Sequence, residues 1–323
     1  MIRYLCVSVP LCDIIKAMTV LKAQVMGFCM GVRRAVDLAF EEARNAVENG
    51  TSVFTIGPLI HNPKVLADLK TAGIQILPPL SDYSRLTANC SLIIRAHGIS
   101  PAFEKELRNT GCRIVDATCP KVKANQLKIQ ELLRDGYFLF LAGTANHAEI
   151  EGLLGYALET APQDSLLTNC VLTGNAEEAR KEAENQFKKN KKIKTALLSQ
   201  TTISGDEYNA IGNEIKKFFS DLKIIDTICA ATSERQKALR ELLPQVGAVI
   251  IVGGEDSANT QNLLAIAEES GKPCVLAEDE EGVPEEFYKF EKVGISAGAS
   301  TPDDVVDGIL EKLTRRHRGT GIE

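Results

Sequence analysis

The 323-residue sequence has no tryptophan, and aromatic residues make up only 5% of it. A chain with so few aromatic rings has little to stack against nucleic-acid bases. Positive charge is also scarce, since 43 acidic residues outnumber 37 basic ones and give a formal charge of −6. No long basic stripe is present to follow a phosphate backbone, and no apolar run approaches the ~18 residues of a membrane span. We therefore expect no nucleic-acid and no membrane partner.

The cysteine content does not indicate a disulfide scaffold. Nine cysteines are an odd number in a long chain, and no convincing secretory signal precedes them, so we expect a reduced protein of the cytoplasm. Four cysteines fall just before or within apolar strand signals, where a buried, inert thiol is the ordinary explanation: Cys90, Cys112, Cys170 and Cys274. Cys6 and Cys12 belong to residues 1–17, an N-terminal extension that need not be ordered.

One pattern occurs three times along the chain: a strand signal ends at a cysteine, and a helix-like stretch follows. The three cysteines are Cys29, Cys119 and Cys229. Each helix-like stretch leads into an apolar strand and a polar loop, and a later strand of each repeat ends in a second polar loop. Strands that alternate with helices predict parallel sheets with right-handed crossovers. The sequence therefore predicts an α/β fold of three units.

The expected boundaries follow from the repeat. The first α/β unit, with its N-terminal strand, should cover residues 18–118, the second 119–228 and the third 229–316, with a tail over 317–323. Ligands of parallel sheets bind beyond the carboxyl ends of the strands, which is where all the polar loops fall. Three units that face one another would therefore gather the three cysteines and the polar loops around a single cavity.

The starts of several helices are marked in the sequence. Asn62 and Ser100 each precede a proline, and Ser204 stands three residues before Glu207 in the spacing of a capping box. Taken singly, such residues are most often helix caps. Their recurrence at equivalent places in three units favours a functional role as well.

Three thiolates at helix N-termini could hold a metal centre with one open coordination position, because the helix dipole favours the deprotonated ligand. The spacing of Cys29, Cys119 and Cys229 matches neither a ferredoxin run nor a zinc knuckle. A catalytic zinc ion is one alternative, although a ligand set of thiolates alone is unusual for hydrolysis. A 4Fe-4S cluster is the other, and soft sulfur ligands favour it, with one iron left free for a substrate oxygen.

Three of the four histidines lie in the polar loops, namely His61, His97 and His147. These loops contain few lysines or arginines, so a bound phosphate would be held by imidazoles, hydroxyls, amides and helix N-termini. Glu149, two residues after His147, can supply protons inside a closed cavity. The competing interpretation is that Glu149 complements the dipole of the helix it begins. Glu151 is close enough in sequence to take either role.

Nine short segments carry a family resemblance: GFCMGV, LIHN, AHGIS, DATCP, NHAEIEG, SQTTIS, CAATSERQ, SAN and AGAST. From about Lys22 to Lys312 the chain resembles the LytB family of 4-hydroxy-3-methylbut-2-enyl diphosphate reductases. The resemblance implies three α/β units in pseudo-threefold arrangement around one 4Fe-4S cluster, held by Cys29, Cys119 and Cys229. It also implies the last step of the non-mevalonate isoprenoid pathway, in which two electrons and two protons remove an allylic hydroxyl. Water, isopentenyl diphosphate and dimethylallyl diphosphate would be the products.

The resemblance also implies roles for single residues. Glu149 would deliver protons, and Thr201 would bind and orient the substrate hydroxyl. The diphosphate would be held by His61, His97, His147, Ser257, Asn259 and Ser300. An electron-transfer protein such as ferredoxin, or flavodoxin with its reductase, would be the partner.

The chain departs from the family's pattern at four positions. Serine is frequent where this chain has Ala258, proline where it has Ala148, histidine where it has Thr144, and a small residue where it has Arg95. The missing hydroxyl at Ala258 removes one expected diphosphate donor.

Two other functions stay open from the residues alone. One is a 4Fe-4S dehydratase or synthase, resembling the three-part quinolinate synthase, that uses the open iron as a Lewis acid without net reduction. The other is a non-catalytic metal- or redox-sensing protein, in which the three cysteines only stabilise the fold.

Overall fold

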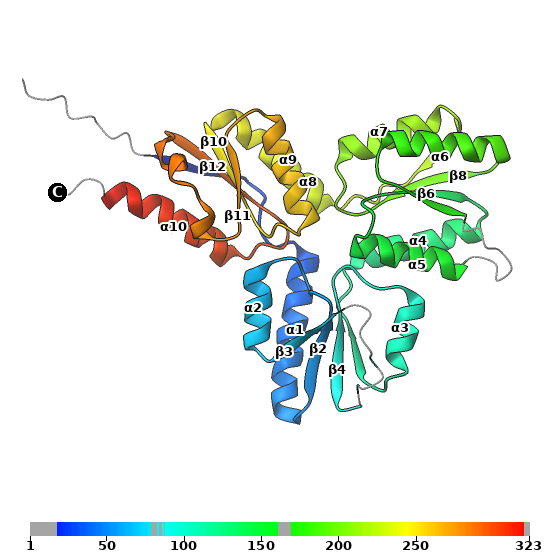
Figure 1. Cartoon of the computed structure of the whole chain (residues 1–323), viewed down its shortest axis with the longest axis horizontal. Helices are drawn as coiled ribbons and strands as arrows, with labels where there is room; N and C mark the ends of the chain where they lie inside the picture. Colours follow the sequence, from blue (N-terminus) through cyan, green and yellow to red (C-terminus); the bar gives the residue numbers. More distant parts are fainter. Residues whose placement is uncertain (1–17, 79–82, 84–85, 87, 161–168, 320–323) are drawn as a thin grey trace, which may run out of the picture.

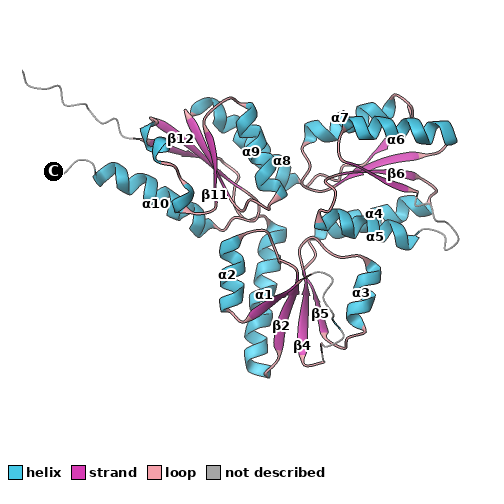
Figure 2. Ribbon diagram, in the orientation of Figure 1, coloured by secondary structure: helices cyan, strands magenta, loops and turns pink. Residues whose placement is uncertain are grey.

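The computed structural model describes residues 18–78, 83, 86, 88–160 and 169–319, without the side chains of the last four. It contains three four-stranded parallel sheets, each covered by helices on both faces, and the three units meet at a common centre (Figures 1 and 2). The α/β class and the three small parallel sheets that the sequence predicts are confirmed. The extension over residues 1–17 lies outside the described residues.

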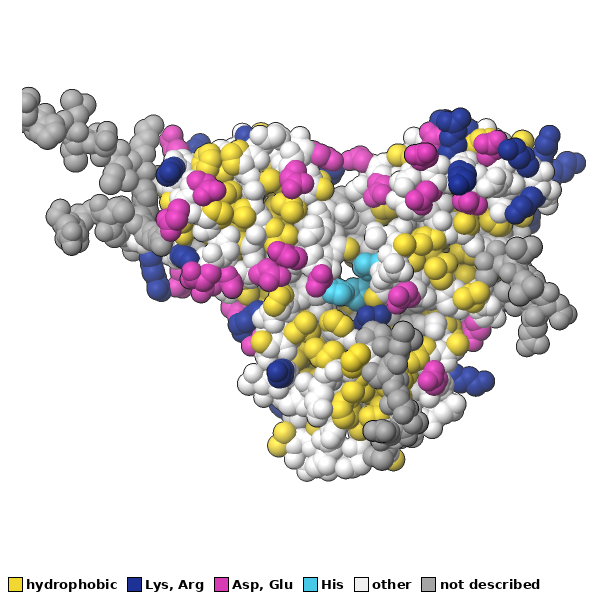
Figure 3. Space-filling model, in the orientation of Figure 1, with side chains coloured by type: hydrophobic (Ala, Val, Ile, Leu, Met, Phe, Trp, Pro, Cys, Tyr) yellow, Lys and Arg dark blue, Asp and Glu magenta, His cyan; other side chains and the backbone are white. Residues whose placement is uncertain are grey.

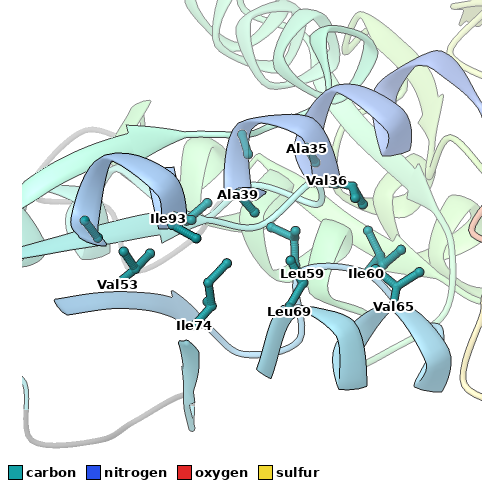
Figure 4. Packing of buried hydrophobic residues seen from close by; sticks show 14 residues of the cluster. Ala35, Val36, Ala39, Val53, Leu59, Ile60, Val65, Leu69, Ile74 and Ile93 are labelled. Carbon is teal, nitrogen blue, oxygen red and sulfur yellow. The ribbon is translucent and has the colours of Figure 1, made fainter. Parts of the chain in front are cut away.

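The first unit has the strand order β3-β2-β4-β5. Its strands are β2 (Ser52–Ile56), β3 (Ile74–Leu77), β4 (Cys90–Ile94) and β5 (Arg113–Asp116), and its helices are α1 (Met30–Asn49), α2 (Pro63–Thr71) and α3 (Pro101–Arg108). Helices α1 and α2 cover one face of the sheet, and α3 covers the other (Figure 2). Alanines on the inner face of α1 allow the helix to lie close to the sheet, as Ala35 and Ala39 do above Val53 and Ile93 (Figure 4).

The second unit repeats this arrangement with the order β7-β6-β8-β9. Its strands are β6 (Phe138–Ala142), β7 (Cys170–Thr173), β8 (Thr195–Ser199) and β9 (Lys223–Ile224), and its helices are α4 (Pro120–Arg134), α5 (Ala148–Thr160), α6 (Ala176–Lys189) and α7 (Gly205–Lys216). Every residue of the central strands β6 and β8 is buried. Continuous apolar runs of this kind are typical of parallel strands covered on both faces.

The third unit has the order β1-β12-β10-β11. Its strands are β10 (Ala248–Val252), β11 (Cys274–Ala277), β12 (Lys292–Ala297) and β1 (Thr19–Lys22), and its helices are α8 (Ala230–Leu242), α9 (Ala258–Glu269) and α10 (Asp303–Gly319). Three short 3-10 turns also occur, at Leu243–Gln245, Glu280–Gly282 and Glu285–Lys289.

The placement of β1 differs from the sequence-based expectation, which assigned this strand to the first unit. In the structure β1 pairs in parallel with β12, with Thr19 opposite Lys292. It is the edge strand of the third sheet, the position that β5 and β9 occupy in the other two. The strand also ends at Lys22 rather than continuing to Cys29, and the intervening residues carry the chain from the third unit into the first.

Two further expectations are corrected by the structure. Cys90 and Cys112 are not separate thiols but form a disulfide, because β4 begins beside the turn that precedes β5. Helix α10 continues to Gly319, past the expected boundary at residue 316. The caps at Asn62, Ser100 and Ser204 are confirmed, since each side chain accepts a hydrogen bond from a backbone N–H three residues later. None of the described helices combines the length and apolarity that a bilayer crossing requires.

Candidate functional site

Each of the three repeated cysteines lies where the chain passes from one unit to the next. Cys29 precedes α1, Cys119 precedes α4 and Cys229 precedes α8, so all three are N-cap residues. The strand before each cysteine belongs to one sheet, and the helix after it belongs to the next unit. The Cys29 thiol accepts the N–H of Val32. A thiol at a helix N-terminus lies at the positive end of the helix dipole, which favours the thiolate.

The backbone fixes all three cysteines in the same way. The N–H of Cys29 donates to the carbonyl of Ala299, that of Cys119 to Ala96, and that of Cys229 to Thr201, at 2.9 to 3.0 Å. Each of these carbonyls belongs to the loop that follows a central strand of a sheet. The loops therefore hold the cysteines in pseudo-threefold equivalent positions.

The three thiols line one cavity of about 100 Å³ at the meeting point of the units. Burial raises the pKa of the Cys119 thiol, and the neighbouring thiols of Cys29 and Cys229 raise it further by charge repulsion, against two backbone N–H groups that lower it. Gly31 leaves the space that this arrangement needs, because a Cβ there would lie 2.5 Å from the Cys119 sulfur. Among the described residues, no three His, Cys, Asp or Glu side chains are grouped as ligands for a single metal ion.

A cluster of three histidines forms another wall of the cavity. The ring centroids of His61 and His97 are 5.1 Å apart, and those of His97 and His147 are 5.3 Å apart. In Figure 3 the histidines lie in a hollow at the centre of the molecule, flanked by basic and acidic side chains. Burial lowers the pKa of all three imidazoles, that of His147 to about 4. They are therefore neutral at pH 7.

The neutral form of His147 has a defined tautomer. Its Nδ1 accepts the backbone N–H of Glu149 at 3.2 Å, which leaves the proton on Nε2. The Nδ1 atom of His97 is buried and has no hydrogen-bond partner among the described residues. The cluster thus offers neutral hydrogen-bond donors to the cavity, which can bind an anion without adding positive charge.

Glu149 and Thr201 form a buried pair at the cavity. The side chain of Glu149 is only 1% exposed, although it lies in the first turn of α5. One carboxylate oxygen accepts the backbone N–H of Thr201 at 2.9 Å, and the other accepts its hydroxyl at 2.8 Å. Burial raises the pKa of Glu149 to about 7, although both hydrogen bonds from Thr201 act to lower it. A carboxyl group with this pKa can both hold and release a proton at neutral pH.

The third unit contributes polar groups to the cavity next to His61. Ser257 caps α9, and Ser300 donates to the carbonyl of His61 at 3.2 Å and lies 3.3 Å from the Ser257 hydroxyl. The Asn259 side chain is 4% exposed, and neither its amide nitrogen nor its oxygen has a hydrogen-bond partner among the described residues. A buried amide usually has hydrogen-bond partners, and those of Asn259 lie outside the described protein groups.

The eleven residues that the sequence singles out all line this cavity: Cys29, His61, His97, Cys119, His147, Glu149, Thr201, Cys229, Ser257, Asn259 and Ser300. Glu151 is not among the lining residues; it lies near Arg95, with 3.7 Å between the charged atoms. Thr202 and Thr232 also line the cavity and were not singled out, although SQTTIS and CAATSERQ contain them. Gly31 was missed as well, and the second glycine of GFCMGV is the signal that could have found it.

Comparison with known proteins gives concordant results. Residues 20–314 match the family model described as LytB protein. A 4-hydroxy-3-methylbut-2-enyl diphosphate reductase of Treponema denticola is 39% identical over 302 residues, covering 92% of this chain and 99% of that protein. The reductase of the same name from Aquifex aeolicus is 37% identical over 292 residues, covering 90% of this chain and 94% of that protein.

Two solved structures share the architecture. The E-1-hydroxy-2-methyl-but-2-enyl-4-diphosphate reductase of Plasmodium falciparum has a TM-score of 0.81, covers 91% of this chain and 87% of its own, and at 24% identity shows the fold alone. A structure of (E)-4-hydroxy-3-methyl-but-2-enyl diphosphate reductase, described as the terminal enzyme of the non-mevalonate pathway, has a TM-score of 0.65. It is 34% identical and covers 92% of this chain and all of its own.

Proposed function

The chain belongs to the LytB protein family, and we propose on this basis that it is an enzyme that reduces 4-hydroxy-3-methylbut-2-enyl diphosphate. The substrate's allylic C–O bond breaks, two electrons and two protons are taken up, and the oxygen leaves as water. The remaining allyl group takes one of the protons at either of two carbons, which gives isopentenyl or dimethylallyl diphosphate. The observation that carries this proposal is the convergence of three cap cysteines, three histidines and the Glu149–Thr201 pair on one cavity.

Membership of the family implies a metal cofactor, and we propose a 4Fe-4S cluster held by Cys29, Cys119 and Cys229. The donor set fits this group, because all three ligands are thiols and they line one cavity. Crowded thiols whose charges repel one another also favour a cationic centre between them. A bound cluster supplies electrons one at a time and a Lewis-acidic iron. These features favour the cluster over zinc.

The diphosphate would be bound by His61, His97 and His147 together with Ser257, Asn259 and Ser300, which line the same cavity as the cysteines. The imidazoles are neutral donors, and the unpartnered atoms of Asn259 and of His97 are available to phosphate oxygens. The N-terminus of α9 adds backbone N–H groups next to Ser257. A substrate held by these groups would have its short carbon chain in the cavity that the three cysteines also line.

Glu149 would act as the proton donor, and Thr201 would orient the hydroxyl that leaves. The Thr201 hydroxyl donates to Glu149, so its own lone pairs remain available to the substrate hydroxyl. The raised pKa keeps a substantial fraction of Glu149 protonated at pH 7, and burial excludes competing acids and water.

Two electrons have to reach this cavity from outside the chain. We propose a small electron-transfer protein as the partner, either ferredoxin or flavodoxin with its reductase. Turnover should then depend on the reduced carrier, and it should stop when the carrier is omitted. A dehydratase or synthase that uses iron only as a Lewis acid would turn over without any reductant.

The direct test is Mössbauer spectroscopy of anaerobically purified, iron-57-labelled protein with and without 4-hydroxy-3-methylbut-2-enyl diphosphate. We expect a 4Fe-4S signal with one distinct iron site that shifts when the substrate is added. A cluster that does not respond to the substrate would favour the dehydratase alternative. Absence of a cluster after reconstitution would exclude both enzymes in favour of zinc or a structural role.

A further inference from the structure

Arg95 is a buried cation whose position the proposed reaction does not explain. It follows directly after β4, two residues before His97, and only 9% of the residue is exposed. Central strands of parallel sheets end at the ligand-binding edge, so the guanidinium lies at the same edge as the histidines. An arginine is almost never buried without a partner that compensates its charge.

The positive charge of Arg95 is only weakly compensated by the described residues. Its Nη2 atom is 3.7 Å from a carboxylate oxygen of Glu151 on α5, which is too long for a hydrogen bond, and the Glu151 side chain is 61% exposed. The Nε–H of Arg95 has no hydrogen-bond partner among the described residues. A solvated ion pair of this geometry contributes little, so the guanidinium retains much of its capacity to bind an anion.

The charge of Arg95 reaches the whole histidine cluster. After burial, repulsion from this guanidinium is one of the causes that lower the pKa values of His61, His97 and His147. Arg95 itself is not among the residues that line the cavity, so it acts on the imidazoles through its charge rather than as part of the cavity wall. Its charge therefore acts on all three imidazoles that line the cavity.

An anion bound in the cavity needs a positive charge to compensate its own. Among the described lining residues of the cavity Lys121 is the one lysine or arginine; it is exposed and lies two residues after Cys119, in the first turn of α4. The rest of the anion site consists of neutral groups, and moving a multiply charged anion out of water is costly unless a positive charge compensates it. Arg95 is placed at the histidine side to do this.

We propose that Arg95 is the fixed positive charge of the diphosphate site, a positioning residue that attracts the anion through the neutral histidine cluster and has Glu151 as its competing counter-ion. The inference rests on the proposed function, because it assigns a charge to the same diphosphate site. It predicts opposite effects for the two members of the pair. Removing the charge of Arg95 weakens diphosphate binding, whereas removing the charge of Glu151 strengthens it.

The test measures binding of inorganic diphosphate to the anaerobic holoenzyme by calorimetry, together with kcat and KM for the organic substrate. For Arg95→Met we expect the Kd and the KM to rise about 10- to 100-fold, the range for a lost interaction with a charged group. The kcat should change far less, because Arg95 does not touch the reacting atoms. Arg95→Lys, which keeps the charge, should recover most of the affinity. Glu151→Gln should lower the Kd by about two- to fivefold, since an exposed ion pair is worth at most ~1 kcal/mol.

Arg108→Met is the matched control. Arg108 forms an exposed pair with Glu104 on α3, so this variant makes the same chemical change without altering diphosphate binding. If Arg95 only holds the first and second units together, Arg95→Met and Glu151→Gln will affect the Kd in the same direction or not at all, and the proposal is overturned. If Arg95→Met does not fold, the sign of the Glu151→Gln effect decides.

The same measurements distinguish failure of the proposed function from failure of the role proposed for Arg95. A wild-type holoenzyme that neither binds inorganic diphosphate nor reduces the substrate would overturn both proposals. A wild-type enzyme that reduces the substrate, with an Arg95→Met variant of unchanged Kd and KM, overturns only the role of Arg95.

Discussion

Replacement of Glu149 by glutamine tests the proton-transfer chemistry with little change of shape. Glutamine keeps an oxygen to accept the N–H of Thr201, and its amide can donate to the Thr201 hydroxyl in place of the present 2.8 Å bond. What it removes is the titratable proton. General acid catalysis contributes about 10²- to 10⁴-fold, so we expect kcat to fall by that factor while the cluster is retained.

The same substitution should make the protein more stable at alkaline pH. Burial raises the pKa of Glu149 from 4.5 to about 7, so the folded state binds this proton more tightly than the unfolded chain. The stability that proton binding by Glu149 contributes is therefore fully present below pH ~4.5, the pKa in the unfolded chain. It is lost as the pH rises through ~7, the pKa in the folded protein, and the total loss in the free energy of unfolding is about 3 kcal/mol. Glutamine cannot ionise. The variant should exceed the wild type by about this amount at pH 8 and by less than ~1 kcal/mol at pH 5.

The assays are steady-state turnover across pH and anaerobic unfolding at pH 5 and pH 8, with iron content as the check on cluster retention. Wild-type kcat should decline above pH ~7, where Glu149 loses its proton. Glu159→Gln, which removes an exposed carboxylate near the other end of α5, is the control and should leave kcat unchanged. Activity of the Glu149→Gln variant within about tenfold of wild type would refute proton delivery by this residue. A stability difference that does not change with pH would refute its raised pKa.

Two further predictions concern the cysteines. Gly31→Ala should lower the iron content of the purified protein and its absorbance from iron-sulfur charge transfer, because the added Cβ would lie 2.5 Å from the Cys119 sulfur. Gly205→Ala, where nothing lies within 4 Å of an added Cβ, is the matched control and should retain full iron content. Cys112→Ser should lower the free energy of unfolding by about 3 kcal/mol, since the disulfide to Cys90 closes a loop with a sequence separation of 22. Denaturation with and without a thiol reductant checks this, because the difference between variant and wild type should disappear when both are reduced.

The features that follow from local sequence were predictable. Helix caps such as Asn62 and Ser204 depend on side chains three residues away, and buried central strands such as β10 are visible as apolar runs. The gathering of Cys29, Cys119 and Cys229 also followed, because all parallel strands place their carboxyl ends at one edge.

The features that could not be predicted from the sequence depend on contacts between segments that are distant in sequence. Nothing in Thr19–Lys22 specifies which sheet it joins, since its pairing with β12 is decided by the assembled units. The pairing of Cys90 with Cys112 depends on how β4 and the turn before β5 are placed. The surroundings of Arg95 could not be inferred either, because its counter-ion Glu151 belongs to another unit.

The position of β1 has a consequence for the order in which the protein can be made. Of the described strands β1 is made first, yet its partner β12, which begins at Lys292, is made last. At about 5–20 residues per second, β1 waits on the order of 15 to 60 s for that partner to be synthesised. The first two sheets contain only strands that are made before β10, so they can form during this interval. The third sheet, and with it the assembly of the three units, can be completed only after β12 has been synthesised.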